Sequence, residues 1–316
     1  YKASIFEYIE VNFNSKFKFN TNVQGNFILD RNQSYRPSPQ LAVTERTTGR
    51  DLSELNYDWA NENYFSYVDN FKFHNINVMV GNSIQGWARE NMNIVGLDYT
   101  TDMIYTLNAA SLFDTQKTYT RMYRHSMTSF FGRAAYNYKS RYLLNANIRA
   151  DGSSRFGTNN KWGFFPSVGL GWRISEETFL ANNKVITNLK LRGSYGITGN
   201  QEIGNYKSLA QLKSKNYIYN DALMQGFYET IGNPDLKWER TKQFDLGFDL
   251  SLWNRIHLNV DYYSRRTSDL LYDVPIPSTS GFSTMLSNIG IVSNKGVEIA
   301  LSGRIVETKD CNCQYK

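Results

Sequence analysis

The chain has 316 residues, of which 41% are hydrophobic and 20% charged, so it is long enough to bury a core. Its 6 Pro and 22 Gly exclude a collagen-like or Pro-rich disordered chain. The apolar runs fall far short of the roughly 18 residues that a membrane helix needs. Although the formal net charge is +6, the basic residues are spread singly, so we do not expect nucleic acid as a partner.

The two cysteines, Cys311 and Cys313, lie near the end of the sequence. They do not make a disulfide framework, and no further Cys or His lies nearby to complete a metal site. We therefore expect neither a metal nor a cofactor. The sequence begins at Tyr1 without a charged segment followed by an apolar one, so we expect any export signal to lie outside it.

Alternation of apolar and polar residues is the main structural signal. In the first clear case, Phe17, Phe19 and Val23 alternate with Lys18 and Asn22. A period of two separates the two kinds of side chain onto different faces only in a β-strand. The same alternation recurs at 142–149, 168–174, 189–195, 244–252, 256–262 and 297–302.

The connections between these segments differ in length. Short turns are expected at Asn14-Ser15, 69–73, Lys139-Ser140 and 253–255. Long polar connections are expected at 31–54, 90–125, 200–239 and 271–289. One stretch, 176–186, has a helical periodicity instead, with Glu176 and Glu177 at the start, where acidic groups favour the helix dipole.

Short turns at one end and long connections at the other are typical of outer-membrane barrels, in which strands of about 9 to 11 residues cross the bilayer. We expect about eleven antiparallel strands, several of about 11 to 14 residues. Apolar side chains then face lipid, and aromatic residues near the strand ends form an interfacial girdle: Tyr142, Trp172, Tyr195, Trp253 and Tyr262. The charged residues of the other face line the interior: Arg133, Arg149, Arg192, Asp245, Asp249, Asp261 and Glu298.

A soluble β-sandwich or propeller also alternates, because one face packs on a core. Strand length and the asymmetry of the connections favour the membrane barrel over these folds. The predicted fold class is therefore all-β, an antiparallel transmembrane β-barrel segment, with residues 1–316 forming part of one barrel domain.

Four stretches resemble the SusC/RagA family of TonB-dependent outer-membrane transporters: RADGSSRFGTNNKWGFFPSVGLGWRISEETFL (149–180), NLKLRGSYGITGNQEIGNY (188–206), GNPDLKWERTKQFDLGFDL (232–250) and DLLYDVPIPSTSGFSTMLSNIGIVSNKGVEI (269–299). The resemblance covers most of 126–305, and HNINVMVGNS (74–83) also looks like a strand of that family. Before Asp58 it is weaker.

The resemblance implies a barrel of roughly 22 strands closed by an N-terminal plug, in the bacterial outer membrane and in contact with its lipid. It also implies a SusD-like surface lipoprotein as partner, and import of glycans or peptides with energy delivered through TonB. No plug or TonB-box segment is recognisable in this sequence, so we expect contact with the TonB complex through a missing N-terminal part. This chain is then a central to late barrel segment of the transporter.

No catalytic motif is present, and we do not expect an enzyme. His74, His125 and His257 are isolated, without an HExxH pattern, and a hydrogen bond in the interior suits His257 better than the role of a general base. Asp30 begins a stretch similar to a calcium loop, but Leu41 stands where the bidentate Glu is needed.

Aromatic residues in the long connections are the ligand-binding candidates, because aromatic faces stack on sugar rings and peptide side chains. The candidates are Tyr206, Tyr217, Tyr219, Phe227 and Tyr228. The competing interpretation is that they pack loop against loop or belong to the girdle. Trp238 lies inside the family-like GNPDLKWE stretch, so we expect a structural role for it.

Two other functions stay open at this point. A passive porin-like barrel would use the same strands to form an open channel, and only the family resemblance separates it from an importer. A secreted soluble all-β binding module would need its apolar faces covered by a second sheet. The identity of the substrate is not encoded in any motif of the sequence.

Overall fold

The structure is a computed structural model that describes residues 1–37, 45–181, 183–220, 222–308 and 311–315. The strands up to the middle of the chain are β1 (Lys2–Asn12), β2 (Phe17–Arg36), β3 (Thr48–Phe71), β4 (His74–Tyr99), β5 (Ala110–Phe113), β6 (Tyr119–Tyr138), β7 (Tyr142–Ser153), β8 (Trp162–Phe164) and β9 (Ser167–Arg173). The later strands are β10 (Ile186–Asn200), β11 (Gln211–Tyr219), β12 (Ala222–Thr230), β13 (Glu239–Leu252), β14 (Ile256–Ser268), β15 (Leu271–Pro275), β16 (Thr284–Asn288), β17 (Ile291–Thr308) and β18 (Cys311–Tyr315). Short 3₁₀ helices are η2 (Leu107–Ala109), η3 (Ile174–Glu176) and η4 (Ser278–Ser280).

The chain divides into two compact units, which are described separately. Unit 1 comprises Tyr1–Ile9, Thr21–Glu62 and Ser83–Met127, and unit 2 comprises the remaining residues, Glu10–Asn20, Asn63–Asn82 and Thr128–Lys316. Strands β1, β2, β3, β4 and β6 contribute to both units. Whether residues 1–316 form part of one barrel domain stays a prediction.

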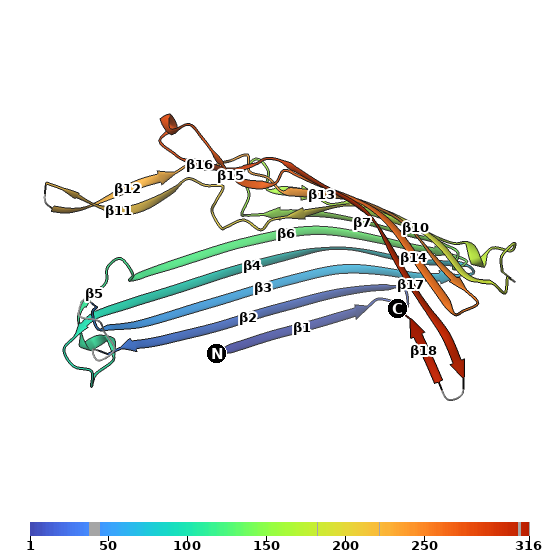
Figure 1. Cartoon of the computed structure of the whole chain (residues 1–316), viewed down its shortest axis with the longest axis horizontal. Helices are drawn as coiled ribbons and strands as arrows, with labels where there is room; N and C mark the ends of the chain where they lie inside the picture. Colours follow the sequence, from blue (N-terminus) through green and yellow to red (C-terminus); the bar gives the residue numbers. More distant parts are fainter. Residues whose placement is uncertain (38–44, 182, 221, 309–310, 316) are drawn as a thin grey trace. The chain divides into compact units, whose positions relative to one another are not determined.

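Unit 1 holds strand segments that follow the order β1-β2-β3-β4-β6, with β5 added on β4 (Figure 1). In this unit the exposed apolar side chains alternate with polar ones along β2, β3 and β4. Val23 and Phe27 on β2, Trp59 on β3 and Ile84 and Met92 on β4 are all exposed. The alternation predicted from the sequence is thus present as two faces with different chemistry.

Unit 2 holds strand segments that follow the order β6-β7-β9-β10-β13-β14-β17-β18, with β8 added on β7. The pairing is antiparallel and in register: Leu191 lies opposite Phe248, and Phe248 lies opposite Val260. These rows of apolar side chains lie on the face that carries the exposed residues Leu246 and Leu301. A large exposed apolar face of this kind marks a surface that contacts lipid or another molecule.

Several strands are longer than the sequence pattern predicted, and four of them much longer. β2, β3, β4 and β6 have 20, 24, 26 and 20 residues. The expectation of long polar loops at 31–54 and 90–125 was therefore wrong in part, because about half of these residues continue the strands. The polar composition of these stretches suggested loops. A strand that extends beyond the apolar region, however, needs no lipid-facing apolar residues there, so its sequence is as polar as that of a loop.

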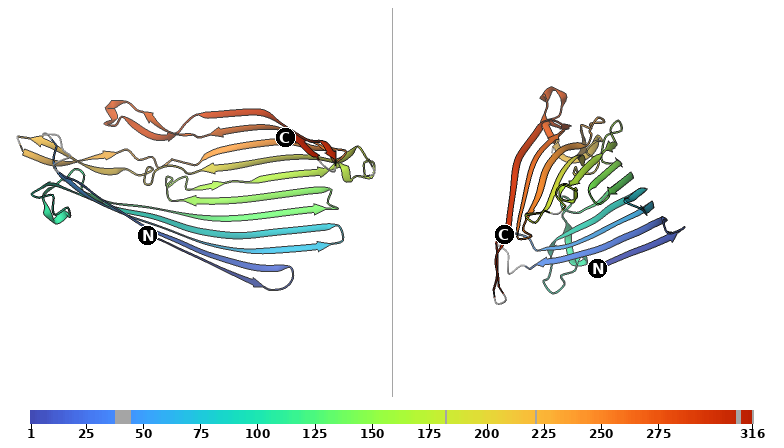
Figure 2. Two further views of the ribbon diagram at one scale, coloured as in Figure 1. Left: turned by 60° about the horizontal axis from the view of Figure 1, so that its bottom comes forward. Right: turned by 90° about the vertical axis from the view of Figure 1, so that its right-hand side faces the viewer.

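Two other expected loops contain hairpins of their own. The connection 200–239 holds the β11–β12 pair, and 271–289 holds the β15–β16 pair. Figure 2 shows the β11–β12 hairpin extending away from the ends of β10 and β13. The predicted short turns at 69–73, Lys139-Ser140 and 253–255 are confirmed, since β-strands flank each of them directly.

The helix predicted at 176–186 is absent from the described residues of that stretch. A single 3₁₀ turn, η3, ends at Glu176, and residues 177–181 form bends and turns. The Glu177 carboxylate does not cap a helix. It accepts hydrogen bonds from the Tyr142 hydroxyl at 2.6 Å and the Trp172 indole at 3.1 Å, which fixes the connection against two strand ends.

Candidate functional site

A buried aromatic cluster joins the long connections of unit 2. Trp238, just before β13, is 3% exposed and packs on Phe156 and Phe165, with ring centroids 4.7 and 5.2 Å away. Its indole N–H donates to the Lys161 carbonyl oxygen at 3.0 Å, as a buried tryptophan requires. The structural role predicted for Trp238 is confirmed.

The backbones of two connections touch at Gly157. A Cβ at this position would lie 2.0 Å from the Pro234 carbonyl oxygen, so no larger residue fits without a shift. The Gly157 N–H donates to the carbonyl oxygen of Leu236 at 3.1 Å, and the Leu236 side chain is fully buried. Residues of the family-like stretches 149–180 and 232–250 therefore form one packed element.

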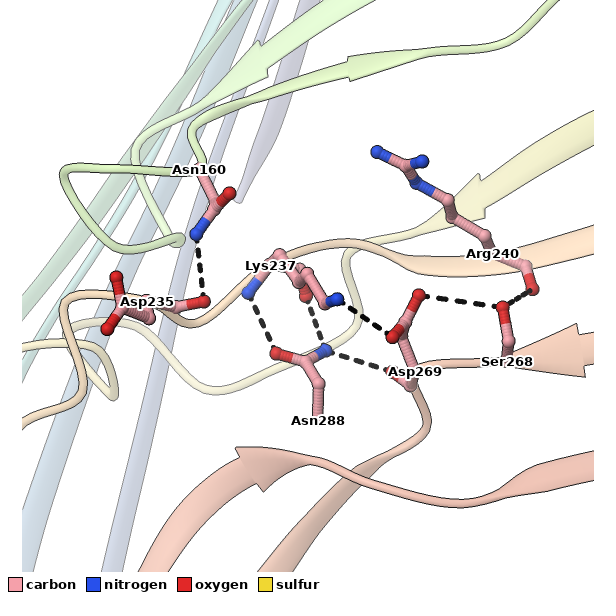
Figure 3. A network of polar contacts seen from close by, with 7 residues as sticks. All are labelled: Asn160, Asp235, Lys237, Arg240, Ser268, Asp269 and Asn288. Carbon is pink, nitrogen blue, oxygen red and sulfur yellow. Dashed lines mark hydrogen bonds and ion pairs between the residues drawn. The ribbon is translucent and has the colours of Figure 1, made fainter.

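A polar network extends this element to the β15–β16 hairpin (Figure 3). The Asn288 side chain accepts from the Lys237 N–H at 2.9 Å and donates to the Lys237 carbonyl at 2.7 Å, which pairs it with that backbone in both directions. The Lys237 ammonium lies 2.9 Å from the Asp269 carboxylate, and Asn160 donates to the carbonyl of Asp235. The long connections are thus anchored at their bases.

The predicted ligand-binding aromatics lie on and beside the β11–β12 hairpin. Tyr206 precedes β11, has a φ of 64° and is 37% exposed, and Tyr219 at the hairpin tip is 70% exposed. Tyr217, Phe227 and Tyr228 lie on β11 and β12, but their side chains lie outside the described part of the chain. The structure brings four of the five residues onto one hairpin. Their contact with a ligand stays a prediction.

Unit 1 has a cavity of about 600 Å³ that the sequence did not reveal. It lies where the ends of β2 and β4 and the start of β3 and β6 approach one another. Its lining includes the cations Arg36, Arg50 and Lys117, and no carboxylate side chain is among the described residues that line it. The strand-borne lining residues Arg50 and Asn93 alternate with the exposed apolar side chains of their strands, so the cavity opens on the polar face.

Arg50 is held in this cavity by a neutral partner. Its Nε donates to the Asn93 side-chain oxygen at 2.6 Å, and the Asn93 amide nitrogen donates to the Lys117 carbonyl oxygen at 2.6 Å. Asn93 is 4% exposed, so both of its amide atoms are fixed within the protein. Among the ion pairs of the described residues, none includes Arg50.

The other two cations of the cavity have acidic neighbours outside its lining. Arg36 lies 2.8 Å from Glu45, and Lys117 lies 3.5 Å from Asp114. Burial raises the pKa of Asp114, but backbone hydrogen bonds from Gln116 and Lys117 outweigh it and hold the pKa below its ordinary value. Asp114 is therefore ionised near neutral pH. Of the three cations that line the cavity, Arg50 is the one that the described carboxylates leave unneutralised.

The polar face of unit 2 is arranged differently, because its arginine is neutralised. Arg192 on β10 contacts Asp249 on β13 at 3.1 Å and Asp261 on β14 at 2.6 Å. It reaches the second strand across Gly247, where a Cβ would lie 2.1 Å from the Asp261 carboxylate. Asn259 also donates to Asp249 at 2.8 Å. The predicted placement of these charged residues on one polar face is confirmed.

Three further expectations concern His257, metal ions and membrane helices. His257 forms a hydrogen bond with the Ser251 hydroxyl at 2.9 Å, as expected for a residue of the polar face. Within the described ranges, no group of three or more His, Cys, Asp or Glu residues could hold a metal ion. A helix long and apolar enough to cross a membrane is not found among the residues that the structure covers.

Comparison with known proteins identifies the family. Residues 4–313 match the family described as TonB dependent receptor-like, beta-barrel. The chain belongs to this family. The predicted fold class, an antiparallel all-β barrel segment, is therefore confirmed, and barrels of this family are outer-membrane receptors and transporters.

Individual relatives agree with this assignment. TonB-dependent receptor P39 of Formosa agariphila is 38% identical over 313 residues, and TonB-dependent receptor SusC of Bacteroides thetaiotaomicron is 34% identical over 268 residues. The alignments cover 98% and 82% of this chain but 30% and 26% of those receptors. The solved structure of the RagAB peptide transporter superimposes with a TM-score of 0.88 and 28% identity, over 99% of this chain and 35% of that chain. The SusC/RagA resemblance is confirmed, and the chain spans about a third of these relatives or less.

Proposed function

We propose that this chain forms part of the barrel wall of an outer-membrane importer for oligosaccharides or peptides. In this proposal the intact receptor works with a SusD-like surface lipoprotein and draws its energy through the TonB complex. The observation that carries the proposal is the superposition on the RagAB peptide transporter along 99% of the chain. The two faces of the strands support it, because one is apolar and exposed while the other carries the charged network.

The long connections are the proposed mouth of the transporter. Their bases are fixed by the Trp238 cluster and by the Asn288 pairing with Lys237, while the β11–β12 hairpin extends beyond them. A rigid base that presents an exposed aromatic hairpin is suited to binding a ligand or a partner lipoprotein. We therefore assign contact with the cargo or the lipoprotein to Tyr206, Tyr217, Tyr219, Phe227 and Tyr228.

Depletion of TonB tests the energised import. In the native host, the full-length receptor should fractionate with the outer membrane, and uptake of its cognate polymer or peptide should stop when TonB is depleted. Uptake that persists without TonB would favour the passive porin-like alternative. Recovery of the receptor in the soluble fraction without detergent would favour the soluble binding module.

Removal of the β11–β12 hairpin tests the assigned mouth. The Gly232 backbone lies against Ala210, and the Asn233 N–H donates to the Ser208 carbonyl at 3.0 Å, so the ends of the hairpin are close together. Replacement of residues 211–230 by Gly-Gly should leave a heat-modifiable barrel, since loop length affects stability only logarithmically, and should reduce uptake. A matched variant with Ser at the five aromatic positions separates the loss of rings from the loss of the hairpin. Normal uptake by both variants would contradict the assignment.

A further inference from the structure

We propose that Arg50 marks a subsite that binds an oxyanion group, a carboxylate or a sulfate, of the imported molecule. This inference rests on the proposed function, because it names a chemical class for the cargo of that importer. It also concerns a place that the aromatic candidates do not include, since the cavity is built by β2, β3, β4 and β6 of unit 1.

The charge of the cavity is the first argument. Arg36, Arg50 and Lys117 line it, and no acidic side chain lines it within the described part of the chain. Arg36 and Lys117 form ion pairs with Glu45 and Asp114, so Arg50 is the lining cation that does not pair with a described carboxylate. The local potential is therefore positive at a place where cargo would pass in an importer.

The way in which Arg50 is held is the second argument. The buried Asn93 side chain takes the Nε donor of Arg50 and is itself fixed by the Lys117 carbonyl, so one edge of the guanidinium is oriented by a neutral group. Hydrogen bonds from guanidinium to an oxyanion are short and strong, and they are often bidentate. An arginine that a neutral residue orients keeps its full charge for such a ligand.

The remaining lining suits a cargo that is also rich in hydrogen-bonding groups. Ser34, Thr48 and Gln116 contribute hydroxyl and amide groups, and Tyr119 contributes an aromatic ring. Arg121 lies over the Tyr119 ring, with its guanidinium carbon 3.9 Å from the ring centroid, which keeps that ring in place. Acidic oligosaccharides and acidic peptides share these requirements, and both carry oxyanions.

Binding of matched charged and neutral probes tests the proposal. The full-length receptor, purified in detergent, is titrated with three probe pairs: oligogalacturonate and its methyl ester, sulfated and plain dextran oligosaccharides, and Glu- and Gln-containing peptides. The wild type should prefer the charged member of at least one pair, and R50Q should reduce affinity for that member about ten-fold or more. R50K should retain part of the preference, since it keeps the charge but not the fork of donors. The responding pair identifies the source of the oxyanion.

A matched control removes a different arginine of the same unit. Arg124 pairs with Glu90 at 3.3 Å and does not line the cavity of Arg50, so R124Q changes the net charge equally and should leave the preference intact. The proposal is overturned if the wild type does not prefer the charged member of any pair, or if R50Q and R124Q behave alike. TonB-dependent uptake of the charged probe, equal in wild type and R50Q, would overturn the oxyanion subsite and leave the import function standing. A charged preference that R50Q removes, without TonB-dependent uptake, would support the subsite and contradict the import function.

Discussion

Arg192 and Arg50 are both strand arginines on a polar face, but their partners differ. Arg192 in unit 2 contacts two carboxylates, Asp249 and Asp261, on two neighbouring strands. Arg50 in unit 1 has an amide, Asn93, as its hydrogen-bond partner and lies beside a cavity. An arginine side chain therefore links neighbouring strands in unit 2, whereas in unit 1 it is an accessible cation.

The partners of a charged residue separate structural from functional charge on a barrel wall. A charge that its own protein neutralises has little attraction left for cargo, whereas it fixes the strands that it links. A charge oriented by a neutral group adds less to stability and more to recognition. The two roles predict opposite results when each arginine is removed.

An arginine placed on the apolar face should have the largest effect. Leu246 is exposed on that face and lies opposite Tyr262, so L246R puts a charge among lipid-facing side chains. We expect a loss of about 2 to 4 kcal/mol of unfolding free energy, the range for arginine at the bilayer midplane. Urea unfolding of the full-length receptor in lipid vesicles measures it. D245R, one residue away on the polar face, should cost much less, and equal losses would contradict the assignment of the faces.

Removal of the linking arginine should have the next largest effect. R192Q leaves Asp249 and Asp261 without their shared cation, and we expect a loss of about 1 to 2 kcal/mol, because Arg192 is only partly exposed. The same urea unfolding measures it. Addition of D261N should recover part of the loss, since one uncompensated carboxylate disappears. Full stability of R192Q would show that the link contributes nothing.

Much of the fold was predictable from the sequence, because the alternation of apolar and polar residues along a strand shows which face of the sheet each side chain lies on. Leu246 and Asp245 could be assigned to opposite faces from the period of two alone. The extent of β3 and β4 could not, because strand residues outside an apolar zone are as polar as loop residues. The helix expected at 176–186 was wrong, because the Glu177 side chain accepts a hydrogen bond from Tyr142 at a strand end and does not cap a helix.

The candidate site was less predictable than the fold. Trp238 could be assigned a structural role because it lies in a recognisable stretch. Arg50 could not be found, since its partner Asn93 is 43 residues away and its significance depends on its forming no ion pair with a described carboxylate. Alternation places Arg50 on the polar face, but only the pairing of distant strands shows which polar residues meet.

Removal of the accessible arginine should hardly affect stability. R50Q loses no ion pair with a described residue, and glutamine retains an amide donor for Asn93, so we expect a change within about 0.5 kcal/mol. The same vesicle unfolding series measures it beside R192Q. A loss as large as that of R192Q would show that Arg50 is also a structural charge, and the comparison would then fail.

Replacement of Glu177 should have the smallest and most specific effect, because the Glu177 carboxylate accepts hydrogen bonds from several donors. It lies in the connection between β9 and β10 and accepts hydrogen bonds from Tyr142, Trp172 and Arg141, the last at 3.2 Å. The hydrogen bond from Tyr142, followed by that from Trp172, lowers the pKa of Glu177 below its ordinary value of 4.5. A carboxylate stabilised in this way is the counterpart of Arg192, with the signs of charge exchanged.

The lowered pKa fixes the sign of the pH dependence. The unfolded chain binds this proton at a higher pH than the folded chain does, so the stabilisation is fully present above the ordinary pKa of 4.5 and is lost as pH falls through the lower folded value. Acidification through that range should destabilise the wild type more than E177Q, whose side chain does not titrate. Urea midpoints measured across the acid range compare the two proteins. Parallel acid profiles would show that the three donors do not favour the ionised form, and the lowered pKa of Glu177 would then have no part in fixing this connection against the strand ends.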